Sequence, residues 1–337
     1  MESLFNSKSL PDRNLALEFS RSTEAAAIAS ARLMGRGDKN AADEVAGNAM
    51  RYMLNTIDMD GVVVIGEGDK EKSPLLYDGD KVGCGKNVSV DIAVDAIDGT
   101  RLTALGMAGA ISVVAGAPRG TMFNPKTPLY IKKIVVGPES REVIDIEAPV
   151  RENIRRVAAA RRKSIGDITV VVLNRPRHDD LIEEIREAGA RIKLVMEGDI
   201  AGALLTCTGE RGADILMGIG TTSAAVISAC AIKSMGGAIQ GKLWARSYEE
   251  QQKAVEAGMD FSQILTIDDL VKSDDVCFAA TGITDGDLLD GVRYDGTHVY
   301  TNSLVMRSKS GTVRYINAVH GLKKVQMIDA VNGAQNE

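Results

Sequence analysis

The sequence predicts an α/β protein with a mixed α+β first half and an α/β second half. In the first half, short β-branched runs bounded by glycine or polar turns follow two helical segments. In the second half, strands and helices alternate at short intervals, which is typical of right-handed βαβ units around a parallel sheet. The 337 residues are 45% hydrophobic and 26% charged, enough for one large or two medium-sized cores. We therefore expect two domains, at 1–150 and 151–337.

The first half is expected to begin with two helices. The first helix starts at Asn14 and ends near Gly35, where a Gly-Arg-Gly run stops it. The second extends from about Ala41 to Asn55. Three strands are expected after it, at 61–68, 89–95 and 110–116.

The second half is expected to start with a helix after the Glu-Ala-Pro run that ends at residue 149. Helices are expected at 151–163, 179–189, 199–206 and 222–234, with strands at 168–173, 191–196 and 214–220. The tail returns to strands, at 276–283 and in a hairpin whose two arms are joined by the turn-like SKSG. Because ligands of α/β sheets bind beyond the carboxyl ends of strands, residues at strand ends are the first candidates for a site.

Composition and charge limit the possible partners. The net charge of −6 is small and mixed in sign along the chain, so we expect no nucleic-acid partner and no membrane-binding face. The sequence contains no apolar run of the roughly 18 residues that a membrane helix needs and starts without a signal-peptide layout, so we expect a cytoplasmic protein. The four cysteines form no CxxC pair, which favours free thiols over disulfides or zinc.

The segment VDIAVDAIDGT places three carboxylates, Asp91, Asp95 and Asp98, within a stretch that otherwise looks like a buried strand. Further acids stand at other element ends: Asp38, Asp43, Glu67 and Asp69. Clustered carboxylates repel one another unless cations lie among them. Oxygen ligands without nearby His or Cys suit Mg²⁺ or Mn²⁺, and such ions accept phosphate oxygens and water. The chemistry indicated is the transfer of a phosphate group to water.

The alternative interpretation is that these acids only cap helices and form turns, as Asp commonly does in glycine-rich segments. The turn at the end of the strand argues against this. It supplies Asp95 and Asp98, then Gly99, whose backbone can approach a phosphate, and Thr100, whose hydroxyl can orient water. We interpret this turn as functional.

The D-x-I-D-G-T turn, preceded by G-E-G about 30 residues earlier, resembles the signature of the lithium-sensitive, metal-dependent sugar and inositol phosphatases. Longer blocks narrow the resemblance over nearly the whole chain to the class II (GlpX-type) fructose-1,6-bisphosphatases. They include MGRGDKNAADE, DGVVVIGEG, LNRPRHDDLIEEIREAGARIKL, FAATGITDGDLLDGV and LVMRSKSGTVR. The resemblance implies a layered αβαβα sandwich of the sugar phosphatase type.

The resemblance also implies roles for single residues. Asp43, Glu67, Asp95 and Asp98 would hold the metals, and Thr100, Asp43 and Glu67 would be catalytic, with Thr100 positioning or deprotonating the attacking water. The expected substrate-binding residues are Asp98, Gly99, Thr100, Tyr130, Arg175, Arg177, Glu197, Gly198 and Asp199. Arginine suits the far phosphate because its planar fork matches phosphate oxygens two at a time. The alternative for Arg175 and Arg177 is a solvated helix entrance, and His178 beside them is expected to be structural.

Three departures from the family pattern bear on the substrate and the metal count. Ala224, in GIGTTSAA, occupies the position of a metal-binding Glu in the family's G-G-x-P-E-G segment. Lys70 and Lys72 replace acids after GEG, and Lys126 lies close to the expected substrate tyrosine.

The expected reaction is hydrolysis of the 1-phosphate of fructose 1,6-bisphosphate or of a related sugar bisphosphate such as sedoheptulose 1,7-bisphosphate. Two alternatives stay open: a relative retuned to another sugar or cyclitol phosphate, and a catalytically weak protein that binds sugar phosphate as a sensor. The partner would be a small-molecule sugar phosphate, and the resemblance implies a homodimer or homotetramer.

Overall fold

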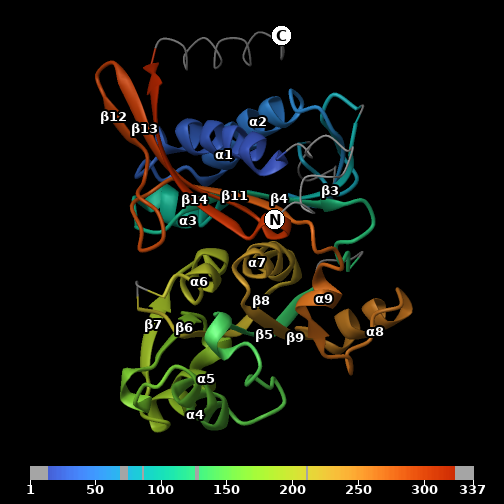
Figure 1. The fold of residues 1–337 in the computed structure, drawn as a ribbon, viewed down its shortest axis with the longest axis vertical. Helices are drawn as coiled ribbons and strands as arrows, with labels where there is room; N and C mark the ends of the chain where they lie inside the picture. Colours follow the sequence, from blue (N-terminus) through green and yellow to red (C-terminus); the bar gives the residue numbers. More distant parts are fainter. Residues whose placement is uncertain (1–13, 69–74, 86, 126–128, 210–211, 323–337) are drawn as a thin grey trace, which may run out of the picture.

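Five alternating layers of helix and sheet make up the protein, seen edge-on in Figure 1. The computed structural model describes residues 14–68, 75–85, 87–125, 129–209 and 212–322. Two helices cover the outer face of one sheet, two more lie between the sheets, and another two cover the outer face of the second sheet (Figure 1). In that order these helices are α1 (Leu15–Ala31) and α2 (Lys39–Leu54), α6 (Asp199–Leu205) and α7 (Thr222–Met235), α4 (Val150–Ala160) and α5 (Asp179–Glu187). The expected layered αβαβα sandwich is confirmed.

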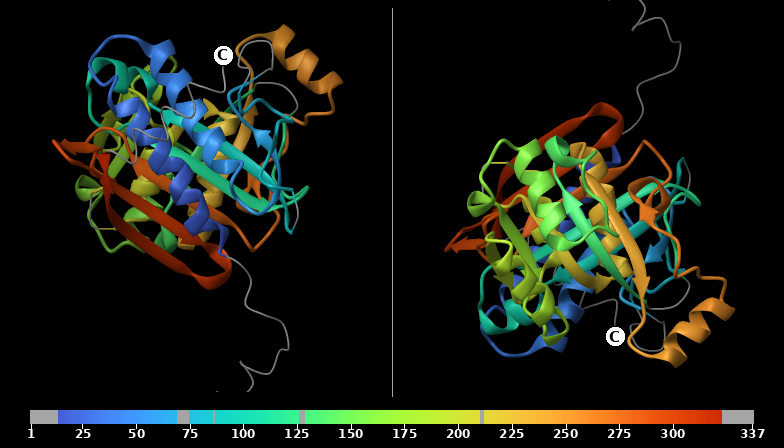
Figure 2. Two further views of the ribbon diagram at one scale, coloured as in Figure 1. Left: turned by 90° about the horizontal axis from the view of Figure 1, so that it is seen from above. Right: turned by 90° about the horizontal axis from the view of Figure 1, so that it is seen from below.

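The first sheet draws its strands from both ends of the chain. Its order is β12-β13-β11-β4-β3-β1-β2, with β14 pairing the other edge of β13. The strands are β1 (Asp60–Ile65), β2 (Lys81–Val82), β3 (Ser89–Asp98), β4 (Ile111–Pro118), β11 (Cys277–Gly282), β12 (Arg293–Asp295), β13 (His298–Arg307) and β14 (Thr312–Gly321). Among the described strands of this sheet, β1 and β3 alone are parallel neighbours. The predicted hairpin through SKSG is confirmed as β13 and β14, which lie at one side of the first sheet in the view from above (red in Figure 2, left).

The second sheet has the order β10-β9-β5-β8-β6-β7. Its strands are β5 (Tyr130–Val136), β6 (Thr169–Leu173), β7 (Arg191–Val195), β8 (Ile215–Thr221), β9 (Ala238–Trp244) and β10 (Leu265–Thr266). The expected parallel pairing holds for β6, β7 and β8, whereas β5, β9 and β10 pair antiparallel to their neighbours. A division at residue 150 stays a prediction, and the sheets group the strands differently because β5 lies in the second sheet and β11 to β14 lie in the first.

Three short helices complete the described chain: α3 (Thr100–Leu105), α8 (Tyr248–Glu256) and α9 (Ile267–Leu270). Helix α3 follows β3 directly and contacts α2. Helix α8 projects at the side of the second sheet in Figure 1. These helices, together with β5 and β9, were not expected from the sequence.

The central helix α7 is buried between the two sheets and contacts strands of both. Its sequence TSAAVISACAIKSM consists mainly of small side chains, so both sheets can approach its backbone closely. On the outer side of the first sheet, Phe19 of α1 lies against Gly116 of β4, where an added Cβ would come within 2.6 Å of the ring. Small residues thus allow close packing of helix on sheet in two of the three hydrophobic cores, the one between the sheets and the one under α1.

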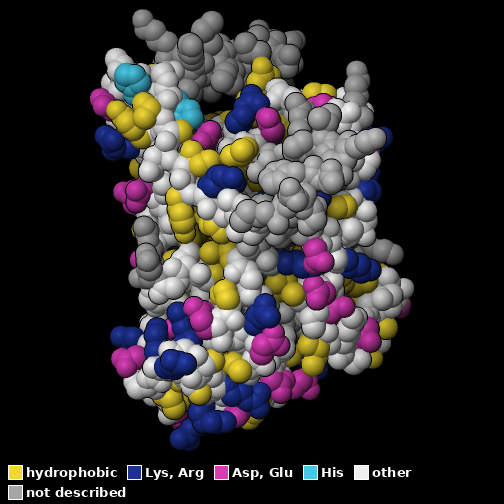
Figure 3. Space-filling view, viewed as in Figure 1, with side chains coloured by type: hydrophobic (Ala, Val, Ile, Leu, Met, Phe, Trp, Pro, Cys, Tyr) yellow, Lys and Arg dark blue, Asp and Glu magenta, His cyan; other side chains and the backbone are white. Residues whose placement is uncertain are grey.

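In the part of the chain that the structure describes, no helix has the length and apolar character needed to cross a membrane. On the face drawn in Figure 3, Lys and Arg side chains are intermixed with Asp and Glu over the lower layers, around α4, α5 and α8. All four cysteines are free, as expected.

Candidate active site

The carboxyl ends of β1 and β3 bring Glu67 beside the aspartate turn. The two strands are parallel neighbours, so the chain leaves both of them at the same edge of the sheet. Glu67 follows β1 by two residues, and its Oε1 accepts a hydrogen bond of 2.9 Å from the backbone N–H of Ala96. This bond fixes the Glu67 carboxylate against the end of β3.

A β-bulge at the end of β3 makes that N–H available. Asp95 pairs with Val113 and Asp98 pairs with Ile111, so β3 uses one residue more than β4 between these two pairs. Residues of a regular strand point to alternate faces, and an odd separation would send Asp95 and Asp98 to opposite sides. The extra residue restores the same face to both. Both carboxylates therefore point toward the middle layer.

The turn after the bulge places Thr100 against Asp43. Gly99 has φ of 102°, a left-handed conformation that favours glycine, and an added Cβ would lie 3.0 Å from the Leu102 side chain. Thr100 then starts α3, and its Oγ1 donates a 2.8 Å hydrogen bond to Oδ1 of Asp43 in α2. The structure thus brings together the glycine, the hydroxyl and the carboxylate that the sequence singled out.

The carboxylates perturb one another strongly. Burial raises the pKa of Asp95 well above its ordinary value, and the charges of Asp98, Glu67, Asp43 and Asp199 all raise it further. The pKa of Asp98 is raised to about 7 by burial and by Asp199, although backbone N–H groups of α6 and the Lys133 ammonium lower it. Such mutual shifts in one place mark a functional-site candidate.

Asp43 and Glu67 share the same environment. Burial raises the pKa of Asp43, while the Thr100 hydrogen bond lowers it. Burial also raises the pKa of Glu67, which the N–H of Ala96 lowers and the charge of Asp43 raises again. All four expected metal ligands therefore belong to one electrostatic cluster.

The cluster has the chemistry of a site for hard cations. All its donors are oxygens, and Oδ2 of Asp98 is buried without a hydrogen-bond partner. Among the residues that the structure describes, however, no three Asp, Glu, His or Cys side chains are close enough to hold a single ion. The residues fit divalent cations by charge and donor type, and they leave coordination positions for other oxygen ligands.

Lys133 is a site residue that the sequence analysis missed. It is 2% exposed on β5, and its Nζ lies 2.5 Å from Oδ2 of Asp199. A buried lysine next to an acid balances its charge, and here it holds the first residue of α6 in place. The sequence signal was available in YIKKIVV, where alternation assigns adjacent lysines to opposite faces of a strand.

Glu197 and Gly198 connect α6 to the aspartate turn. Oε2 of Glu197 accepts a 3.0 Å hydrogen bond from the backbone N–H of Arg101, and its Oε1 lies 3.6 Å from the Arg175 guanidinium. Gly198 has φ of 84°, and a Cβ added there would lie 3.8 Å from Oδ2 of Asp98. Both residues thus lie beside the acidic cluster, and Arg175 is tied to it through Glu197.

Tyr130 and Arg177 form a second group, at the end of the second sheet. The Arg177 guanidinium lies 5.4 Å from the centroid of the Tyr130 ring and donates through Nε and Nη2 to the carbonyl of Ile219. Arg246 also lies over this ring, at 5.2 Å, and Trp244 meets it edge-on. Arg246 and Trp244 were not singled out from the sequence.

His178 is structural, as expected. It is 1% exposed; its Nδ1 is 2.7 Å from the carbonyl of Leu173, and its Nε2 accepts a hydrogen bond from the N–H of Ile219. These bonds define a neutral ring with its proton on Nδ1, and burial lowers its pKa. The imidazole therefore joins the 173–178 segment to β8.

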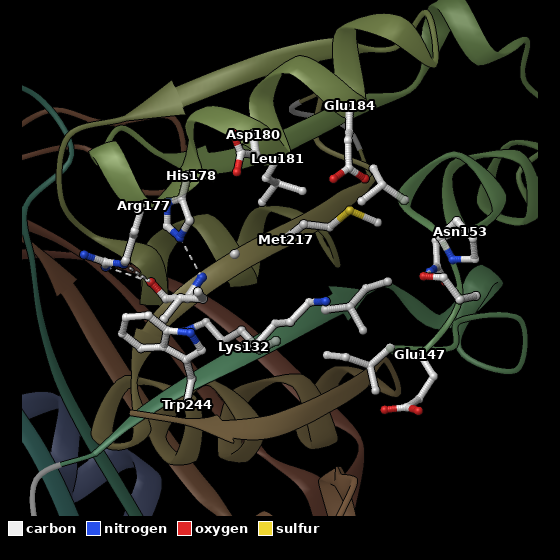
Figure 4. A pocket seen from close by; sticks show the side chains of 18 residues that line it. Lys132, Glu147, Asn153, Arg177, His178, Asp180, Leu181, Glu184, Met217 and Trp244 are labelled. Atoms are coloured by element: carbon white, nitrogen blue, oxygen red, sulfur yellow. Dashed lines mark hydrogen bonds between the residues drawn. The ribbon is translucent and has the colours of Figure 1, made fainter. Parts of the chain in front are cut away.

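A cavity of about 460 Å³ lies on the outer face of the second sheet, between β5, β8 and α5. Figure 4 shows Lys132 extending into it, with Arg177, His178 and Trp244 at one end and Glu184 and Glu147 at the other. None of the four clustered carboxylates lines it. The acidic cluster, with its hydroxyl and its unpartnered carboxylate oxygen, is the better candidate for the reacting centre, and the cavity adjoins only the Arg177 end.

Two acids of the sequence motifs have structural roles instead. Asp91, the first acid of the VDIAVDAIDGT segment, has its partners elsewhere: its Oδ2 accepts hydrogen bonds from the N–H groups of Thr121 and Met122, and its Oδ1 lies 3.5 Å from Arg119. Asp38 caps α2 by accepting from the N–H of Ala41. These are the cap and turn roles considered as the alternative for the acids.

Ala224 lies in the first turn of α7, 7% exposed and within the main hydrophobic core. Its orientation toward the metals stays a prediction. Asp69, Lys70, Lys72 and Lys126 lie outside the described residues.

Comparisons with known proteins identify a family. The family described as bacterial fructose-1,6-bisphosphatase, glpX-encoded, matches residues 13–320. Fructose-1,6-bisphosphatase 1 class 2 of Escherichia coli strain K12 is 43% identical over 325 residues, covering 93% of this chain and 96% of the relative. Fructose-1,6-bisphosphatase class 2 of Shigella flexneri has the same identity and coverage.

Proposed function

Because the chain belongs to the glpX-encoded bacterial fructose-1,6-bisphosphatase family, we propose that the acidic cluster at the end of β3 is its catalytic centre. The protein is a metal-dependent hydrolase of phosphoric monoesters, and its substrate is a sugar bisphosphate. The observation that carries the assignment of the centre is the Thr100–Asp43 hydrogen bond inside a cluster of carboxylates that raise one another's pKa.

Asp43, Glu67, Asp95 and Asp98 would hold divalent cations, which we propose to be Mg²⁺ or Mn²⁺ because every donor is an oxygen. When bound, such ions neutralise the carboxylates and the charge that develops on the transferred phosphate. The unpartnered Oδ2 of Asp98 is the donor most in need of a cation.

Thr100 and Asp43 would prepare the water that attacks phosphorus. Since Oγ1 of Thr100 donates its proton to Asp43, the lone pairs of this oxygen are free to accept a hydrogen bond from water. That bond would orient the water toward the phosphorus atom and polarise its O–H bond. Because its pKa is raised, Asp43 is suited to accept a proton through Thr100. Glu67 would be the third catalytic residue of this centre.

The substrate would extend from the aspartate turn toward the second sheet. The 1-phosphate of fructose 1,6-bisphosphate would lie against Asp98, Gly99 and Thr100, where the left-handed glycine exposes the backbone. Glu197, Gly198 and Asp199 would line the middle of this path. Tyr130, Arg175 and Arg177 would bind the far end, which in a sugar bisphosphate carries the second phosphate.

A phosphate-release assay with Mg²⁺ or Mn²⁺ over a panel of sugar phosphates tests the proposal. We expect fructose 1,6-bisphosphate to be hydrolysed to a monophosphate. Sedoheptulose 1,7-bisphosphate is assayed in the same way as a second candidate substrate. A chelator should abolish turnover. Preference for another sugar or cyclitol phosphate would instead identify a retuned relative, and binding without turnover would identify a sensor.

We further propose that the protein works as a homodimer or homotetramer in the cytoplasm, without nucleic acid or membrane partners. Light scattering on the purified chain gives the oligomeric state. A monomer at micromolar concentration would contradict the first part of this proposal.

A further inference from the structure

Arg246 follows β9 by two residues and lies beside the group at the end of the second sheet. Tyr130 opens β5 and pairs directly with Trp244 at the end of β9, so both aromatic side chains project from the same face. Trp244 meets the Tyr130 ring edge-on, with centroids 6.0 Å apart. The Arg246 guanidinium lies 5.2 Å from the centroid of the same ring.

Glu250 holds Arg246 in this position. Its Oε1 accepts from Nη2 of Arg246 at 2.8 Å and from Nε at 3.2 Å, and its Oε2 accepts from the Arg246 backbone N–H. Glu250 in turn belongs to the first turn of α8, which Ser247 caps. An arginine that is 63% exposed is thereby kept in one orientation before any ligand arrives.

Arg246 and Arg177 use their donors in the same way. Arg177 donates hydrogen bonds from Nε and Nη2 to the carbonyl of Ile219, as the dashed lines in Figure 4 show. Arg246 donates hydrogen bonds from Nε and Nη2 to the Glu250 carboxylate. Within the described residues, Nη1 of each guanidinium has no partner. Two oriented cations with free donors therefore lie within 5.4 Å of the centroid of one aromatic ring.

We infer that Arg246 is a specificity-determining residue, which together with Arg177 binds the far phosphate of the substrate over Tyr130. The inference rests on the proposed function. A phosphate dianion presents several oxygens, so it can accept from two guanidiniums at once, and the fixed arginines would lose little side-chain entropy on binding. A monophosphate that lacks the far phosphate gains nothing from this pair.

The test compares fructose 1,6-bisphosphate with fructose 1-phosphate in the metal-loaded enzyme. We expect Arg246→Ala to lower the selectivity ratio, kcat/KM for the bisphosphate over kcat/KM for the monophosphate, by about tenfold. Most of this loss should come from KM of the bisphosphate. Arg246→Lys should recover part of the ratio because it keeps the charge and loses the fork, and Glu250→Gln should give an intermediate loss because it releases the guanidinium.

Arg155→Ala is the matched control. Arg155 is 62% exposed on α4 and bonds Glu152 at 2.7 and 2.9 Å, so it resembles Arg246 in exposure and pairing but lies away from the site. Its removal should leave the selectivity ratio unchanged. A ratio in Arg246→Ala equal to that of the wild type or of this control would overturn the inference.

The same measurements separate the bisphosphatase activity from the role of Arg246. If the wild-type enzyme turns over neither substrate, the proposed function and the role of Arg246 both fall. If the wild type is an active bisphosphatase and Arg246→Ala keeps both its ratio and its KM, only the role of Arg246 is wrong.

Discussion

Replacing Asp98 by asparagine should make the metal-free protein more stable at alkaline pH while removing its activity. Asp98 is 7% exposed, its Oδ2 has no hydrogen-bond partner, and burial with the neighbouring Asp199 raises its pKa from 3.8 to about 7. A carboxyl whose pKa is raised in the fold contributes stability at low pH, and this contribution is lost as the pH rises through the folded pKa. In the metal-free protein, the ionised form of Asp98 is therefore the form that destabilises the fold.

The magnitude follows from the size of that shift. At 1.36 kcal/mol for each tenfold change in the ionisation equilibrium, the charged form is disfavoured by up to about 4 kcal/mol. Part of this belongs jointly to Asp95 and Asp199, so we expect Asp98→Asn to gain about 2 to 3 kcal/mol at pH 8. At pH 5 the gain should fall to about a third of that value, because the unfolded carboxyl is already largely ionised there and the folded one is not. It should vanish only below the ordinary pKa, at about pH 3, where a protonated carboxyl and an amide both carry a donor at the unpartnered position.

Urea unfolding in EDTA at pH 5 and pH 8 measures the difference, and repetition with Mn²⁺ completes the experiment. The ion should raise the unfolding free energy of the wild type and much less that of Asp98→Asn, while phosphate release by the variant falls by at least about 10²-fold. Equal stability of the two proteins at pH 8 in EDTA would refute the electrostatic reasoning. Near-normal turnover by the variant would refute the assignment of Asp98 to the metals.

Three further substitutions test other parts of the molecule. Thr100→Ala should lower kcat by about 10²-fold or more and change KM little, since its hydroxyl would act on the attacking water; a loss confined to KM would make Thr100 a phosphate clamp. Ala224→Glu should lower the Mn²⁺ concentration for half-maximal phosphate release if residue 224 faces the metals, and an unchanged midpoint would place it away from them. Glu24→Gln should raise the unfolding free energy by about 1 to 2 kcal/mol at pH 8 and by only about a quarter as much at pH 5, because burial raises the pKa of Glu24 to about 7 and its charged form destabilises the fold; equal effects in urea at both pH values would contradict this.

Local patterns predicted much of the fold. The βα alternation at 168–234 specified β6, β7 and β8 with their helices, because each element carries its own hydrophobic period. The strands β5 and β9 were missed, although AIQGKLW of β9 shows a regular alternation of burial. Each pairs antiparallel within a sheet that the sequence indicated to be parallel, and the strand order depends on contacts between distant segments.

The candidate site was predictable to the extent that its residues lie in short motifs. Glu67 and Asp98 stand at strand ends, and strand ends are where sheet proteins build sites. Lys133 and Arg246 belong to no motif. Their positions in the structure are set by ion pairs with Asp199, 66 residues away in the chain, and with Glu250, 4 residues away. Asp91 illustrates the reverse case: it lies in the densest acidic motif, yet its partners are backbone N–H groups of the turn after β4.

The β-bulge in β3 explains why an acidic motif of this spacing can form one centre. Asp95 and Asp98 are three residues apart, an odd number that a regular strand would resolve onto opposite faces. One additional residue between the pairs Asp95–Val113 and Asp98–Ile111 changes that parity, and it also releases the N–H of Ala96 to bind Glu67. A single irregularity in the hydrogen-bond ladder thus gathers two aspartates on the inner face and orients a third carboxylate beside them. The motif supplies the charges, and the bulge determines that they meet.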